Sequence, residues 1–212
     1  MERLPVGAAV LVALLAVGAC SSGDGAPVVA NRISVDDARA AAAEAAPAEC
    51  PLGADVPDVL ADAGAGATAE FDDAAATVAK TDEPAADPIA AERGGMSAVD
   101  ATAGAEIECH YTAGDAEFDV YVVVTKSKGA VNLLAPLVVR EAHMTPADLE
   151  KVLVPAPEPG DVTIASDTVA LGALPADGGD AAMMIRSTIR GISGDKLGDV
   201  HEDLALRLKL QG

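Results

Sequence analysis

Aromatic side chains are nearly absent from this chain of 212 residues, which contains two Phe, two Tyr and no Trp. Its core must therefore be built from Ala, Val, Leu and Ile, which gain stability by burying aliphatic surface. Because sugars are usually held against aromatic faces, the composition also argues against a carbohydrate-binding protein.

Basic residues are scarce as well. The chain has 14 Lys and Arg against 34 Asp and Glu, which gives a formal net charge of −20 at pH 7. Binding to nucleic acid or to anionic lipid headgroups requires clustered positive charge. We therefore expect no nucleic-acid partner and no direct adhesion of the protein surface to anionic lipid.

The apolar segment at residues 4–19 is too short for a membrane-spanning helix. It consists of Leu, Val, Ala, Gly and one Pro. Its roughly 16 residues fall below the ~20 that are needed to cross ~30 Å of hydrocarbon. Arg3 precedes the segment and small residues end it, as in the apolar region of a secretory signal peptide.

The end of this segment, Val17-Gly18-Ala19-Cys20, resembles the lipobox of bacterial lipoproteins. The resemblance implies cleavage before Cys20 and a diacylglyceryl group on the Cys20 sulfur. We accordingly assign residues 1–19 to a signal peptide and residues 20–33 to a lipidated tether, and we expect the protein at the outer face of the cell membrane. An uncleaved membrane helix with a chance cysteine is the alternative interpretation.

The other two cysteines, Cys50 and Cys109, are a lone pair in a chain that is expected outside the cytoplasm. Oxidising surroundings favour a disulfide between them, and two unpaired buried thiols are the alternative. Their wide separation and the absence of a CxxC pattern give no zinc signature.

Polar residues followed by helix-forming sequence predict three capped helices. Ser34 is expected to cap a helix that Pro47 stops, and Asp55 a shorter one that Gly64 ends. Thr145 is expected to cap a third, which has Pro at its first position.

Apolar residues at helical spacing predict two more helices, at residues 130–138 and 197–208. Ser193 is expected to cap the last of these. Pro and Gly interrupt residues 65–104, where apolar side chains larger than Ala are few, so we expect this segment to be a long loop and the least structured part.

Alternating apolar and polar residues predict strands. The clearest pair is residues 106–112 and 117–125, joined by a tight turn at Gly114-Asp115. A two-residue loop there would set Tyr111 opposite Phe118, Cys109 opposite Val120, and His110 opposite Asp119. Further strands are expected at residues 162–174 and 181–189.

Together these elements predict a single α+β domain over residues 34–212, in which helices flank an antiparallel sheet and one disulfide is present. Its distinctive features are Cys50-Pro51-Leu52 before a helix, Cys109 two residues before an aromatic residue, a late strand at residues 181–187, and Ser193-Gly194-Asp195 before the last helix. In these features the chain resembles uncharacterised lipoprotein domains of high-GC Gram-positive bacteria, which are distantly similar to extracellular sensor domains of membrane kinases. The resemblance implies an α+β fold with a Cys50–Cys109 bond and brings no catalytic residues.

Catalytic motifs are mostly missing. Ser193 and Lys196 match the S-x-x-K motif of penicillin-binding proteins and class A β-lactamases, but the companion motifs are absent as a set. A helix-capping Ser193 explains the same residues. The nucleophile elbow, zinc-protease, P-loop and EF-hand motifs do not occur. We therefore expect no catalytic residues, no cofactor and no enzymatic activity, and we expect the scattered histidines at the surface: His110, His143 and His201.

The predicted hairpin places a cluster of four carboxylates and one imidazole on its outward face. Such a group could bind a divalent cation, act as a pH-responsive patch, or be a solvated sheet face. Alternate strand positions lie ~6.6 Å apart, so convergence on a metal would need another element, and we expect no metal site. The residues are Glu106, Glu108, His110, Glu117 and Asp119.

These observations favour a membrane-anchored, non-enzymatic binding or sensor-type module for an envelope protein or a small ligand, acting through its sheet or through residues 65–104. The alternative is a carrier of lipid or another aliphatic ligand. An internal apolar pocket of several hundred Å³ would favour the carrier, and a filled core would favour the binding module.

The lipid anchor is directly testable. Replacing Cys20 with Ser removes the sulfur that would form the thioether, so the variant should remain an unprocessed precursor without lipid. Cells fed labelled palmitate should label the wild-type protein and not the variant. Equal labelling of the two proteins would show that Cys20 is not the modified residue.

Overall fold

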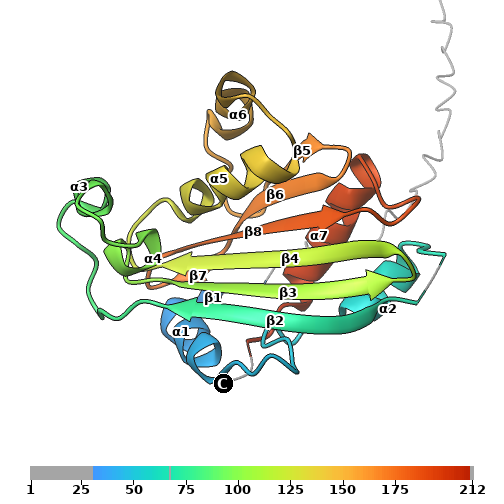
Figure 1. Cartoon of the computed structure of the whole chain (residues 1–212), viewed down its shortest axis with the longest axis horizontal. Coiled ribbons are helices and arrows are strands. Elements are labelled where there is room, and N and C mark those ends of the chain that lie inside the picture. Colours follow the sequence, from blue (N-terminus) through green and yellow to red (C-terminus); the bar gives the residue numbers. More distant parts are fainter. Residues whose placement is uncertain (1–30, 67, 211–212) are drawn as a thin grey trace, which may run out of the picture.

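A six-stranded antiparallel sheet forms the centre of the protein (Figure 1). The computed structural model describes residues 31–66 and 68–210, so Cys20 and the predicted signal peptide lie outside the described residues. The strand order is β2-β3-β4-β8-β6-β5. The strands are β2 (Glu70–Val78), β3 (Ala105–Ala113), β4 (Ala116–Thr125), β5 (Val162–Ser166), β6 (Val169–Leu174) and β8 (Asp180–Ser187).

A short parallel pair joins the beginning of the described chain to the rest of the domain. In it β1 (Ile33–Ser34) lies beside β7 (Ala176–Asp177). Ile33 stands at the end of the segment predicted as a tether, and its side chain is buried.

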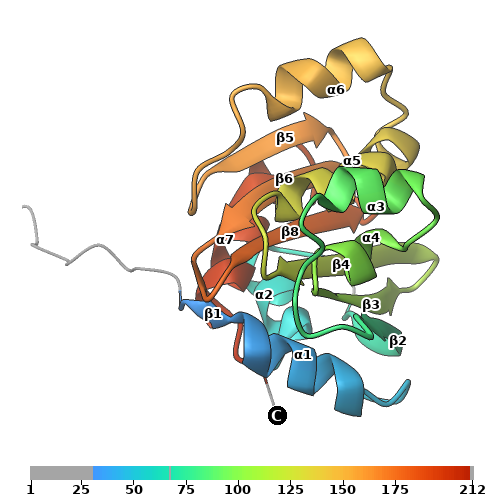
Figure 2. The ribbon, with the colours of Figure 1, turned by 90° about the vertical axis from the view of Figure 1, so that its left-hand side faces the viewer.

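Helices cover both faces of the sheet (Figure 2). The inner face packs against α1 (Val35–Glu44), α2 (Val56–Asp62) and α7 (Asp195–Arg207). The outer face packs against α5 (Ala130–Glu141) and α6 (Pro146–Leu153). Two short helices, α3 (Pro88–Arg93) and α4 (Ala98–Ala101), lie in the connection between β2 and β3. The predicted α+β class, with an antiparallel sheet flanked by helices, is confirmed.

The β3–β4 hairpin has the predicted register. Tyr111 pairs with Phe118, and His110 pairs with Asp119. On β3 buried residues alternate with half-buried or exposed ones, as the sequence pattern predicted. On β4, in contrast, every residue from Phe118 onward is buried, because the central strand contributes to the cores on both faces.

Three predicted helix caps are present. The side-chain oxygens of Ser34, Asp55 and Thr145 each accept a hydrogen bond from the backbone N–H three residues later, at 3.2, 3.1 and 3.2 Å. The predicted cap at Ser193 is wrong. The chain enters α7 through Gly194 at a φ of +55°, and Gly194 donates its N–H to the carbonyl of Asp167. Ser193 therefore lies outside the helix and is exposed.

The prediction of a long loop at residues 65–104 is wrong, because the segment contains the edge strand β2 and two short helices. The side chains of β2 are mostly exposed and do not alternate cleanly, so periodicity alone could not identify this strand. The strand is held in place by pairing with β3 from Glu70 to Val78, with an irregularity between Phe71 and Asp73. Residues 162–174, predicted as one strand, turn at Asp167-Thr168 and form two, β5 and β6.

The disulfide between Cys50 and Cys109 is present, with its Cα atoms 5.7 Å apart. It joins the segment before α2 to the middle of β3. Near it, Ala74 of β2 donates a backbone hydrogen bond to Pro47, so the same segment also contacts the edge strand. Among the described residues, none of the helices has the length and apolar character that a membrane crossing requires.

Removing the disulfide should destabilise the domain strongly. The bond spans a sequence separation of 59 residues, and closing a loop of this size is worth about 4 kcal/mol in the chain-entropy model. A Cys50→Ala/Cys109→Ala variant of a soluble Ser21–Gly212 form should lose about this much free energy of unfolding in urea titrations. Reduced wild-type protein is the matched control, because it lacks the bond but keeps both sulfurs, and it should show a similar loss. A loss below about 1 kcal/mol in both would contradict the expectation.

Candidate functional site

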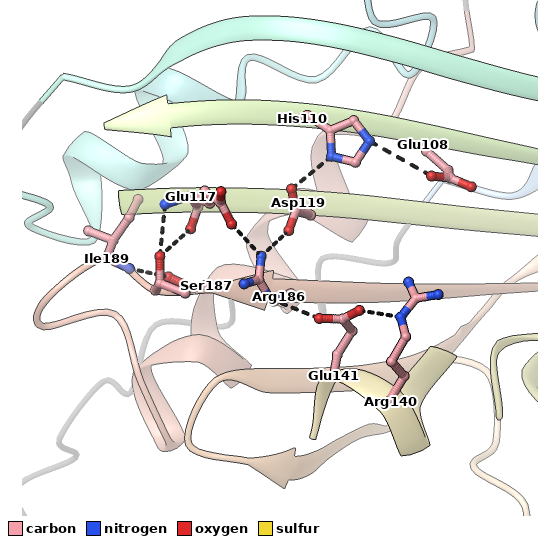
Figure 3. A network of polar contacts seen from close by, with 10 residues as sticks. Glu108, His110, Glu117, Asp119, Arg140, Glu141, Arg186, Ser187 and Ile189 are labelled. Atoms are coloured by element: carbon pink, nitrogen blue, oxygen red, sulfur yellow. Dashed lines mark hydrogen bonds and ion pairs between the residues drawn. The ribbon is translucent and has the colours of Figure 1, made fainter. Parts of the chain in front are cut away.

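A row of three paired residues crosses the outer face of the sheet. The strand registers place His110 opposite Asp119 on β4, and Asp119 opposite Arg186 on β8. The His110 Nδ1 atom lies 2.8 Å from Asp119 Oδ1, and Arg186 Nη1 lies 2.7 Å from Asp119 Oδ2 (Figure 3). A carboxylate only accepts hydrogen bonds, so both neighbours donate to Asp119. Its side chain is 8 % exposed.

Arg186 holds this group together. Besides Asp119, its guanidinium contacts Glu117 through Nη1 at 2.9 Å and Glu141 through Nε at 3.1 Å. Glu141 also accepts a hydrogen bond from Arg140 Nε at 2.6 Å, at the end of α5 (Figure 3). A guanidinium presents its donors in a fixed plane, and this suits it to holding several carboxylates at once. Sequence reasoning missed Arg186, because nothing in the sequence indicates that β8 lies beside β4.

Burial and the neighbouring acids have opposite effects on the pKa of His110. Partial burial alone lowers the pKa of His110, but the hydrogen bond and charge of Asp119, with the charges of Asp73 and Glu108, outweigh burial and raise this pKa above its ordinary value. The nearest Glu108 oxygen is 3.7 Å from Nε2. The imidazole also meets the ring of Tyr121 edge to face, with the centroids 6.1 Å apart.

Burial also affects two neighbours of the row. Glu106 lies on the same face of β3, and burial, with the nearby charge of Glu108, raises the pKa of Glu106. Burial and the charge of Asp119 raise the pKa of Tyr121 in the same way, so its phenol stays neutral at physiological pH. The outward face is thus partly covered, and it is not the fully solvated face that was one of the sequence interpretations.

The predicted constellation is therefore brought together only in part. His110, Asp119 and Glu117 join one network through Arg186, with Glu108 at its margin, whereas Glu106 lies further along β3. Within residues 31–66 and 68–210, no group of three or more His, Cys, Asp or Glu is arranged to hold a metal ion. The counter-charge of Glu117 and Asp119 is the guanidinium of Arg186.

The remaining candidate residues lie elsewhere. Ser193 is exposed and lies outside α7, whereas Lys196 lies in its first turn. His143 is exposed as expected, but His201 is buried with 1 % exposure, so the expectation of a surface position was wrong for His201. Helical spacing could have placed it on the apolar side of α7, next to Leu197, Val200 and Leu204.

Comparison with known proteins gives no relative. No family model matches this chain, and no curated protein or solved structure matches it.

The raised pKa of His110 predicts a pH-dependent contribution to stability. A histidine that binds its proton more tightly when folded stabilises the protein fully below its unfolded pKa of about 6.5, and this stabilisation disappears as pH rises through the folded value. His110→Gln should therefore cost more free energy of unfolding at pH 6 than at pH 9, as measured by urea titration. Made in an Asp119→Asn background, the same change should show a smaller difference between the two pH values. If the free energy of unfolding lost in His110→Gln were constant or grew with pH, the raised pKa of His110 would be contradicted.

Proposed function

We propose that this protein is a lipid-anchored, extracytoplasmic and non-enzymatic binding module that holds a basic protein of the cell envelope. Its binding surface is the open half of the outer face, by which we mean the outward side chains of β2 and β3 together with Glu117 at the start of β4. The observation that carries the proposal is that, within residues 31–66 and 68–210, helices cover only one half of this face.

The covered half lies over β8, β6 and β5. There α5 and α6 bury an aliphatic cluster that includes Tyr121, Leu134 and Met184. In Figure 1 both helices lie toward the β5–β6 side of the sheet, and β2 and β3 run clear of them. The outward side chains of these two strands remain exposed or half-buried. The open half is part of a sheet that is already folded, so its residues need no ordering before they bind. This lowers the entropic cost of association.

The open half is anionic. It carries Asp73, Glu106, Glu108 and Glu117, and the cation nearest to it, Arg186, already contacts three carboxylates. A surface of one charge sign attracts a partner of the opposite sign and selects against other partners. The complementary partner is therefore a protein surface rich in Lys and Arg.

The lipid anchor would limit where the partner can be. The predicted lipidation site is Cys20 and the described chain starts at Asn31, so the connection cannot exceed roughly 40 Å even when fully extended. The partner would then lie in the envelope close to the membrane.

The filled cores favour this proposal over the carrier alternative. Large side chains such as Phe118 and Ile185 on the inner face and Met184 on the outer face are completely buried against their neighbours. An aliphatic cargo would need the space that they occupy.

The proposal can be tested by crosslinking in living cells. Ala75 pairs with Glu108 and is exposed in the middle of the open half, so a photo-crosslinking amino acid there should capture the partner. Asp73→Asn/Glu108→Gln should weaken binding of the captured and purified protein by roughly tenfold, if each lost charge contributes up to 1 kcal/mol. Binding should also weaken as salt is added.

The matched control is Glu44→Gln/Glu49→Gln, which removes the same charge near α1, on the other side of the sheet. It should leave affinity unchanged. Equal effects of the two double variants would mean that overall charge matters and that the open half is not the binding surface. A captured protein that binds both variants as tightly as the wild type would also overturn the proposal.

A further inference from the structure

A cleft of about 460 Å³ opens between the β2–β3 connection and α5. Residues of α3 and α4 form one wall, and residues in the first half of α5 form the other (Figure 2). The volume falls within the roughly 300–1,000 Å³ that is typical of binding clefts. The walls are largely apolar, because they include Pro88, Ile89, Ala98, Leu133 and Pro136.

Ile89, in the wall formed by α3, presents a large apolar side chain to solvent. Its side chain belongs to a residue that is 63 % exposed, and among the described residues the other exposed large apolar ones are Met96 and Val154. Met96 lies in the same connection as Ile89, whereas Val154 lies apart from them, directly after α6. Exposed apolar surface that continues into a cleft is typical of a contact site for another molecule.

The cleft lies at the end of the sheet where the open half begins. Thr102 lines the cleft just before β3, and Lys128 lines it just after β4. Glu106, the first outward acid of β3, follows Thr102 by four positions. Because α5 covers the outer face of the sheet, a cleft against α5 opens on the same side as the open half. A partner that lies across β2 and β3 can therefore reach it.

The charges around the cleft fit the same kind of partner as the open half. Asp87 and Glu92 of α3 are exposed acids in the lining, and Lys128 is the cation there. Acids thus outnumber cations at the cleft as they do on the open half, which favours a basic partner. A second copy of this chain would be repelled, because it carries a net charge of −20.

We propose that the basic envelope partner anchors itself by inserting one apolar side chain, flanked by Lys or Arg, into this cleft beside Ile89. The inference rests on the proposed function, because it gives the same partner a second point of contact. In protein interfaces a few side chains that fill pockets carry most of the binding energy, and polar contacts surround them. Here the cleft is the pocket, and the acids of the open half attract the partner and orient it.

Crosslinking in living cells separates this inference from the proposed function. In the full-length lipoprotein, a photo-crosslinking amino acid at Ile89 should capture the same protein as one at Ala75, and one at Val154 should not capture it. Capture from Ala75 alone would overturn the cleft and leave the open half standing. Capture from Ile89 alone would support the cleft and contradict the open half, and capture from neither position would overturn both.

Affinity measurements with the captured and purified protein then test the apolar contact. Ile89→Ser removes an exposed side chain, so the core stays intact, and binding should weaken about tenfold through the lost apolar contact. This loss should persist at high salt, because salt screens charges and not apolar contacts. Val154→Ser is the matched control at a residue that is 66 % exposed, and it should leave the affinity unchanged. An Ile89→Ser variant that binds as tightly as the wild type, or equal losses in both variants, would refute the anchor.

Discussion

The register of the central strand β4 is the constraint on which the rest of the structure depends. Its alternate side chains enter two different cores, with Phe118 and Val120 on the inner face and Tyr121 and Val123 on the outer face. A slip of one residue would exchange the two sets and would bury the wrong groups on both sides. The same register sets Asp119 between His110 and Arg186. The polar row on the outer face is therefore a product of the strand pairing that also builds the cores.

The basic residues of the chain lie close to its acidic side chains. Several of the few arginines contact carboxylates at places where distant parts of the chain meet: Arg207 joins Asp62 to Asp203, and Arg32 joins β1 to Asp177. Most of these pairs are exposed and contribute little stability individually. Arg186 is different, because its contacts are better buried. Without this guanidinium the carboxylate of Asp119 would be buried without a counter-charge, which would destabilise the fold. Within the described chain no Lys or Arg forms an ion pair with Asp73, Glu106 or Glu108, and these acids give the open half most of its charge.

Local features of the fold could be predicted from the sequence, whereas most long-range contacts could not. The Cys50–Cys109 bond is a long-range contact that could be predicted, because Cys20 is expected to carry lipid and two cysteines then remain. Three helix caps and the β3–β4 register depend on residues within a few positions of one another, and alternation and turn chemistry reveal them. Arg186 and Asp119 are separated by 67 positions in the chain, and no local pattern indicates that their strands are neighbours. The strand β2 was missed because its order comes from its partner β3 and not from its own Ala-rich and acidic sequence.

The burial of His201 escaped prediction for a related reason. An imidazole between apolar residues of a helix is tolerated inside only if the opposite element leaves space for it, and here that space comes from Gly172 on a different strand. Ser193 was misassigned because the residue that follows it, Gly194, adopts a left-handed φ and itself begins the helix. In both cases a glycine, which carries no side-chain signal of its own, decided the outcome.

The disulfide also affects how the domain would respond to proteases. Its loop runs from Cys50 to Cys109 and contains β2, α3 and α4, including Ile89, which is 63 % exposed. The connection between β2 and β3 is a part of this loop in which a protease would find exposed residues. A single cut there would leave two fragments that remain covalently joined, with β2 still held beside β3 by its ladder. The domain could thus be nicked without losing its edge strand.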